Sequence, residues 1–172
     1  MTEIERKLQQ MGYELPKLPM DMKYWARCSR VGNLVFMGTT AAWPIVNKTV
    51  EGKLRGVIGK DVTVEEAKFA CKMAALSILS ALKNELGDLD KVDKIVRLEV
   101  YVSGVTGLSI SSVSGSSSIS ISLSPEPYVE IADAASELFI KLYGENGRAT
   151  RTITPSIQDF IVELDMVVSV KD

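Results

Sequence analysis

The end of the chain restricts the fold more than any other stretch. Apolar residues occupy every second position between residues 160 and 168, which predicts a β-strand with one face on a core. Glu163 and Asp165 stand between them, and a core-covering strand avoids such charges unless its second face meets a polar environment. That second face also carries Ile161 and Val167, so it is neither fully polar nor fully apolar. Another subunit often covers a face of this kind, and a symmetric oligomer is the natural arrangement.

The length and composition fit one domain. The chain has 172 residues, of which 46% are hydrophobic, and this is enough for a proper core. We therefore treat residues 1–172 as a single domain. Residues 1–10 are polar and lack a signal-peptide core, and no apolar run approaches the roughly 20 residues of a membrane span. We predict a cytoplasmic protein with reduced cysteines and no membrane partner.

The composition also excludes several chemistries. The chain contains no histidine, so it has no Ser-His-Asp or Cys-His nucleophile and no histidine-bound metal. Its two cysteines, Cys28 and Cys71, are too few for a cysteine-rich zinc site or a disulfide framework, and we predict no metal. The net charge is −2 and the pI is about 5.3, which argues against a nucleic-acid partner held by bulk electrostatics.

Capping boxes mark the starts of two helices. Thr2 is followed by Glu5, and Thr63 is followed by Glu66, at the spacing that lets each pair satisfy two free backbone N–H groups. The second helix has a broad apolar stripe, so most of it should be buried, and Gly87 is a natural stop.

Alternating patterns and turn residues locate the remaining elements. A third helix is predicted at residues 131–143, with Asp133 as a possible N-cap. Strands are predicted at residues 24–30, 33–40, 92–103, 149–154 and 160–170. In the strand at 92–103 one face is predicted to carry Val96, Leu98, Val100 and Val102.

A serine-rich insertion occupies residues 104–124. Serine-rich sequence of low complexity usually forms a flexible linker. Here, however, serine alternates strictly with Ile119, Ile121 and Leu123, and a similar pattern begins at Leu108 and Ile110. We therefore predict a β-hairpin that protrudes from the domain. The complete element order indicates an α+β domain with helices on one face of a mixed sheet.

The chain resembles the RidA family, also called YjgF or L-PSP-type proteins. Six segments in a shared order carry this resemblance, and the last two resemble a branch with an extra N-terminal helix: residues 30–36, 59–67, 86–92, 98–102, 134–138 and 144–148. The resemblance implies a chorismate-mutase-like fold and a homotrimer whose three sheets enclose a barrel. Ligand pockets would lie in the clefts between subunits.

The resemblance also implies an activity. Family members with a complete site hydrolyse reactive enamines and imines to a keto acid and ammonia, and they need no cofactor. The alternative is a non-catalytic member that binds a small carboxylate or metabolite in the same cleft. Endoribonuclease activity, which is often attached to the family's name, fits less well with the acidic pI and the lack of a basic, aromatic stripe.

Two charged residues are the main site candidates. Arg151 aligns with the family's substrate-binding arginine, whose planar guanidinium can grip a carboxylate with two hydrogen bonds. The alternative is a structural ion pair with Glu163, Asp165 or Glu99. Glu163 aligns with an acidic residue that could position a water and shuttle a proton, or else could be paired inside the barrel. Arg148 is a rival to Arg151 but lies nearer the turn.

The resemblance implies further contacts around the substrate. Tyr24 and Trp25 stand where the family has an aromatic residue at the pocket mouth, although core packing explains such a residue as well. The backbone of Ile153 could bond the substrate or water, and Thr39 or Thr40 could replace the family's serine hydroxyl. The family's Leu-Pro pair between the last two strands is missing, and the connection at residues 155–159 is shorter.

Overall fold

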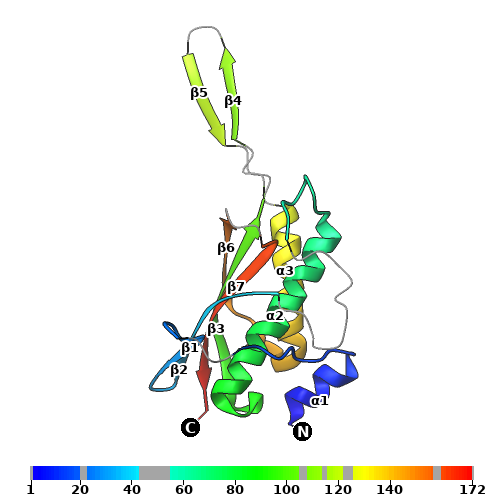
Figure 1. The fold of residues 1–172 in the computed structure, drawn as a ribbon, viewed down its shortest axis with the longest axis vertical. Helices are drawn as coiled ribbons and strands as arrows, with labels where there is room; N and C mark the ends of the chain where they lie inside the picture. The colour runs from blue at the N-terminus through cyan, green and yellow to red at the C-terminus, as the bar shows by residue number, and fades with distance from the viewer. Residues whose placement is uncertain are drawn as a thin grey trace.

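The computed structural model describes residues 2–19, 23–42, 55–104, 108–113, 116–121, 126–156 and 160–171. The elements run in the order α1 (Glu3–Gln10), β1 (Cys28–Val31), β2 (Leu34–Ala41), α2 (Val64–Leu86), η1 (Leu89–Lys91), β3 (Val92–Ser103), β4 (Leu108–Val113), β5 (Ser116–Ile121), α3 (Glu126–Tyr143), η2 (Gly144–Gly147), β6 (Thr150–Ser156) and β7 (Val162–Val170). The predicted α+β class, with a mixed sheet and helices on one face, is confirmed (Figure 1).

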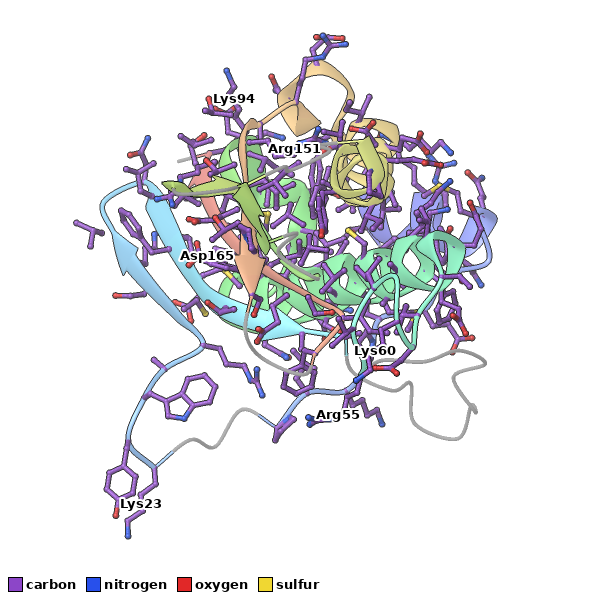
Figure 2. All side chains as sticks on the ribbon, turned by 90° about the horizontal axis from the view of Figure 1, so that it is seen from above. Lys23, Arg55, Lys60, Lys94, Arg151 and Asp165 are labelled. Atoms are coloured by element: carbon purple, nitrogen blue, oxygen red, sulfur yellow. The ribbon has the colours of Figure 1, made fainter. Side chains whose placement is uncertain are left out.

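The main sheet has the strand order β1-β2-β7-β3-β6. The pairs β1–β2, β2–β7 and β3–β7 are antiparallel, whereas β3–β6 is parallel. The strands β1 and β6 therefore form opposite edges, and β7 lies in the centre. In Figure 2, seen along the sheet, α2 and α3 lie on one side of it.

The register assigns each residue of the central strands to a face. Val100 pairs with Leu164 on one side and with Ile153 on the other, and the side chains of Val100 and Leu164 are fully buried against the helices. Glu99 pairs with Asp165, so these two carboxylates lie on the outer face, away from the helix layer. The predicted two-faced character of the last strand is confirmed.

Local sequence explains where the helices begin and end. Both predicted capping boxes form, with the hydroxyls of Thr2 and Thr63 each accepting a backbone N–H of the first turn. Gly87 ends α2 in a left-handed conformation at φ 75°, which glycine adopts without steric cost. Most of α2 is buried, as its broad apolar stripe predicts.

Three predictions about elements are wrong. The third helix begins at Glu126, so Asp133 is an interior residue of α3 and not its N-cap. The first strand begins only at Cys28, which leaves the residues before it outside the sheet. Val96 is 39% exposed while Ile95 is buried, because a register shift between Ile95 and Arg97 changes the alternation of faces in β3.

The serine-rich insertion contains the predicted hairpin. The strands β4 and β5 pair antiparallel with each other in a separate two-stranded sheet, with Leu108 opposite Ile121 and Ile110 opposite Ile119. Figure 1 shows this hairpin projecting beyond the layered body, between the end of β3 and the start of α3. No helix in the described ranges is both long enough and apolar enough to cross a bilayer.

Candidate functional site

Arg151 lies on the edge strand β6, opposite Leu98 of β3 in the register. Leu98 is buried against the helices, so Arg151 shares this helix-facing side, and Figure 2 shows it beside α3. Its Nη1 donates to Oδ1 of Asp133 at 2.6 Å and to Oγ of Ser136 at 3.0 Å. Arg151 therefore has an ion-pair partner, but this partner lies on α3 and is none of the three carboxylates expected from the sequence.

The guanidinium still has hydrogen-bonding capacity. Both of its hydrogen bonds within the described ranges use Nη1, which leaves the N–H groups of Nε and Nη2 uncommitted there. The side chain is 22% exposed. Asp133 and Ser136 thus hold one nitrogen, while the remaining donors retain the two-pronged geometry that matches a carboxylate.

Two residues close to Arg151 in the sequence have different surroundings from it. Ile153, two residues along, shares its face and is half-buried. β6 pairs with β3 on one side and has no other strand partner in the described ranges, so its outer edge can offer backbone groups to a ligand. Arg148 precedes the strand, is 69% exposed and pairs with Glu145 at 3.4 Å, as its place near the turn predicts.

Glu163 lies on the opposite face of the sheet from Arg151. It pairs in the register with Tyr101 of β3 and Ala41 of β2, and it is 7% exposed. A single protomer therefore does not bring Arg151 and Glu163 to the same ligand, because the sheet lies between them. This separation is the main difference from the arrangement expected from the sequence.

The outer face carries a polar network around Glu99. Arg97 forms an ion pair with Glu99, and the hydroxyl of Thr154 donates to the same carboxylate at 3.1 Å. Burial raises the pKa of Asp165, Arg97 opposes this shift, and Glu99 reinforces it. Burial likewise raises the pKa of Tyr101, with further contributions from the charges of Glu99 and Asp165. The face is thus partly desolvated even in one protomer.

In the described part of the chain, no cluster of three or more acidic, cysteine or histidine side chains could hold a metal.

The two candidate threonines lie far from Arg151 within a protomer. Thr40 is buried opposite Leu164, and its hydroxyl donates to the carbonyl of Gly38 at 2.9 Å. Thr39 is exposed at the register shift of β2. Since β7 and β3 separate β2 from β6, both threonines lie on the other half of the sheet from Arg151.

The aromatic candidates project from the body. Tyr24 is 85% exposed and Trp25 is 54% exposed, so neither is a core residue. The amino group of Lys23 lies 5.0 Å from the Tyr24 ring centre, and the guanidinium of Arg27 lies 5.3 Å from the Trp25 ring centre. Figure 2 shows the segment with Lys23 extending away from the layers. This segment leads into β1, the sheet edge opposite β6.

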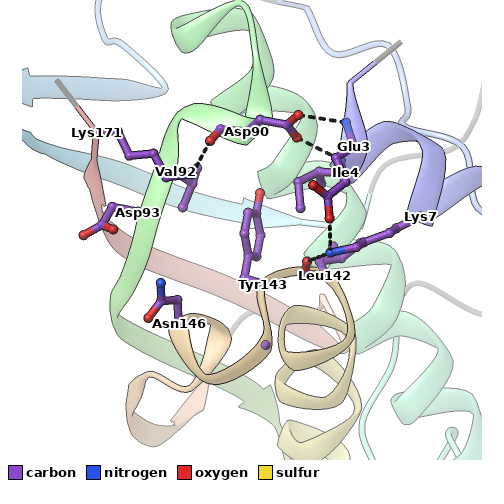
Figure 3. Close-up of a pocket in the computed structure, with 11 residues that line it drawn as sticks. Glu3, Ile4, Lys7, Asp90, Val92, Asp93, Leu142, Tyr143, Asn146 and Lys171 are labelled. Carbon is purple, nitrogen blue, oxygen red and sulfur yellow. Dashed lines mark hydrogen bonds and ion pairs between the residues drawn. The ribbon is translucent and has the colours of Figure 1, made fainter.

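Two cavities of the protomer lie elsewhere. One, of about 340 Å³, lies between α1, η1, β3 and the end of α3 (Figure 3). Three of its charged side chains already have partners: Asp90 accepts the backbone N–H groups of Glu3 and Ile4, and Lys7 donates to the carbonyl of Leu142 and pairs with Glu3 at 2.9 Å. A second, of about 860 Å³, lies between residues 58–66, which include the first turn of α2, and the start of α3. Neither Arg151 nor Glu163 lines either of these two cavities.

The sequence matches one protein family over residues 5–168, which is nearly its whole length. The chain belongs to the YjgF/chorismate-mutase-like family. The description of this family also reads "putative endoribonuclease". The resemblance stated from the sequence segments is therefore confirmed, and so is the chorismate-mutase-like fold.

Solved structures and a curated relative are similar to this YjgF-family chain. A structure from Shewanella oneidensis, named "putative endoribonuclease", has a TM-score of 0.77 and 22% identity, and the match covers 97% of this chain and 99% of that one. A protein of unknown function from Agrobacterium tumefaciens has a TM-score of 0.73 and 24% identity, with 98% and 94% covered. Protein TCP17 of Trypanosoma cruzi is 33% identical over 103 residues, which are 59% of this chain and 54% of that protein. The match thus spans about half the length of this curated relative.

Sequence reasoning on this YjgF-family chain missed the two residues that hold Arg151. Asp133 and Ser136 are three residues apart, so they lie on the same side of α3. They interrupt a run of buried alanines that includes Ala132 and Ala135. Polar residues at helical spacing within a buried stretch were the available signal, but the assumed start of the helix assigned Asp133 to a cap.

Proposed function

We propose that this chain forms a homotrimer that hydrolyses small 2-imino or 2-enamino acids at sites shared by neighbouring copies. The observation that supports this most is the division of the candidate residues between the two sheet edges. Arg151 and Ile153 lie on β6. Tyr24 and Trp25 precede β1, and Thr39 lies on β2. A contact between the β6 edge of one copy and the β1–β2 edge of the next would unite them. Such a head-to-tail contact closes into a ring when the rotation permits.

The reaction needs one anchor and one proton carrier. Arg151 would bind the substrate carboxylate through its uncommitted N–H groups, and the exposed β6 backbone at Ile153 would bond the substrate or the water. Water adds to the carbon of the protonated imine and gives a proton to the carboxylate of Glu163, which leaves a carbon–nitrogen single bond. Glu163 then returns this proton to nitrogen. The carbon–nitrogen bond breaks with its electron pair leaving on ammonia, while the hydroxyl proton passes to the Glu163 carboxylate and the C=O bond of the keto acid forms. In this scheme, Glu163 belongs to a different copy from the Arg151 that it serves.

A second candidate is a trimer that binds small carboxylates without turnover. The burial of Glu163 and its position on the opposite face from Arg151 favour this alternative. The carboxylate anchor would be the same, and only the water-activating group would be missing.

Keto-acid release from freshly generated 2-iminopropionate tests the proposal. We expect the protein to accelerate pyruvate and ammonia formation, and we expect Arg151→Ala to lower kcat/KM by at least 100-fold because a charged hydrogen-bond pair is lost, worth about 3 kcal/mol. Arg148→Ala is the matched control, since Arg148 is an exposed arginine just before the same strand, and it should leave the rate unchanged. Pyruvate binding that depends on Arg151 without any acceleration would support the binder instead.

A further inference from the structure

We propose that Asp133 makes the Arg151 site selective for singly charged carboxylates over dianions such as phosphate, and that Ser136 fixes the position of the guanidinium. This inference rests on the proposed carboxylate site. It concerns two residues of α3 to which the sequence analysis assigned no role at the site. Both act through Arg151, so they are positioning residues.

The ion pair leaves the site with little net charge. The Asp133 carboxylate lies 2.6 Å from Nη1 of Arg151, so one negative charge already balances the guanidinium. A monocarboxylate can still use the directional N–H groups of Nε and Nη2. A dianion offers the same hydrogen bonds, but its second charge also meets the repulsion of Asp133.

Solvent screens this repulsion only in part. Cys71 of α2 lies close enough to interact with both charges, and burial raises its pKa to about 12, so the side of the pair that faces the core is poorly solvated. The Asp133 side chain is 49% exposed and the Arg151 side chain is 22% exposed. An anion approaching from the outside therefore meets Asp133 as well as Arg151.

Ser136 orients the guanidinium independently of charge. Its hydroxyl accepts from Nη1 of Arg151 at 3.0 Å and donates to the carbonyl of Ala132 at 3.4 Å. The serine oxygen is thereby fixed on the helix, and Asp133 is placed one turn earlier on the same side. Together they direct Nη1 towards α3, and neither of them bonds the N–H groups of Nε and Nη2.

Paired titrations with pyruvate and inorganic phosphate test the inference. Asp133→Asn retains an oxygen that can accept from Nη1 and removes only the charge. We expect it to raise phosphate affinity about three- to tenfold more than pyruvate affinity, as the loss of one repulsion at about 6 Å in an effective dielectric of about 40 implies. Glu137→Gln is the matched control, because it removes the same charge one turn further along α3, where Glu137 is exposed and makes no hydrogen bond to Arg151. It should change the ratio of the two affinities less than twofold.

Further variants separate the possible outcomes. Ser136→Ala should weaken the binding of both anions by a similar factor, about two- to tenfold, with an unchanged ratio. If Asp133→Asn leaves the ratio of phosphate affinity to pyruvate affinity unchanged, the proposed selectivity is overturned. This holds even if Arg151→Ala abolishes pyruvate binding and so supports Arg151 as the carboxylate anchor. Pyruvate binding that survives Arg151→Ala overturns the proposed function instead. Asp133→Ser, which also keeps an oxygen acceptor, gives the same comparison if Asp133→Asn does not fold.

Discussion

At Gly147, the backbone of α3 leaves no room for a side chain. A methyl group there would overlap the carbonyl of Phe139 and approach the backbone nitrogen of Ile140 to 2.8 Å. Because helix backbone cannot move aside as a flexible side chain can, we expect Gly147→Ala to destabilise the protein by about 3 kcal/mol. For a chain of this size, the unfolding temperature should fall by roughly 6–12 °C. Asn146→Ala, at the exposed neighbouring position, is the control, and equal unfolding temperatures for the two variants would contradict the close contact.

The sequence was least informative about the partners of individual site residues and the sheet faces on which these residues lie. The side chain of Arg151 was recognised from its alignment, but its partner Asp133 lies 18 residues earlier on another element. No local pattern specifies that β6 lies beside α3 at this register, since the pairing is a product of tertiary packing. The opposite faces of Arg151 and Glu163 follow from the register of three strands, which the alternation within each strand does not determine.

At the scale of elements, α1 is held by carboxylates that must be ionised. Asp90 accepts the N–H groups of Glu3 and Ile4 at 2.8 Å each, and Glu5 accepts from Lys83 at 2.5 Å. Burial alone would raise the pKa of Asp90, but the hydrogen bonds from Ile4 and Glu3 outweigh it and lower the pKa below 3.8. The hydrogen bond from Lys83 lowers the pKa of Glu5 below 4.5.

Both folded-state pKa values are lower than the unfolded ones, so this stabilisation is present above the unfolded values and is lost as pH falls through the folded ones. We expect α1 to detach on acidification below about pH 4, and the backbone amide resonances of Glu3 and Ile4 should report this by NMR. In Asp90→Asn the charge is absent, so the pH dependence of these two resonances should be much weaker. Resonances that stay constant from pH 6 to pH 3 in the unchanged protein would contradict the prediction.

Element identity was predictable because each signal is local. Capping boxes at Thr2 and Thr63 and the stop at Gly87 rest on contacts within one helical turn, and all three form as expected. The errors arose where neighbouring strands decide the outcome. The register shift that exposes Val96 is a property of the pairing between β3 and β7, and the sequence of β3 alone does not contain it.

At the scale of the whole molecule, the outer sheet face gives a test of assembly. Phe36 lies on this face opposite Val167 and is 45% exposed, while Val129 of α3 is 39% exposed and lies on the helix layer. In the proposed trimer, a neighbouring copy covers Phe36, whereas Val129 stays exposed. We expect Phe36→Asp to dissociate the assembly because it buries an unpaired charge, whereas Val129→Asp should not.

Sedimentation equilibrium measures this directly. The unchanged chain and Val129→Asp should each have about three times the mass of one chain, and Phe36→Asp should have the mass of one chain. A single-chain mass for the unchanged protein would remove the shared site and, with it, the proposed activity.

The strand order β1-β2-β7-β3-β6 has a consequence for folding during synthesis on the ribosome. The central position between β2 and β3 belongs to residues 162–170, which are translated after every other strand. Until those residues leave the exit tunnel, the two halves of the nascent sheet present unpaired inner edges, and such edges invite mispairing with other chains. Cotranslational folding can thus assemble helices and hairpins early, but closure of the sheet must wait for β7.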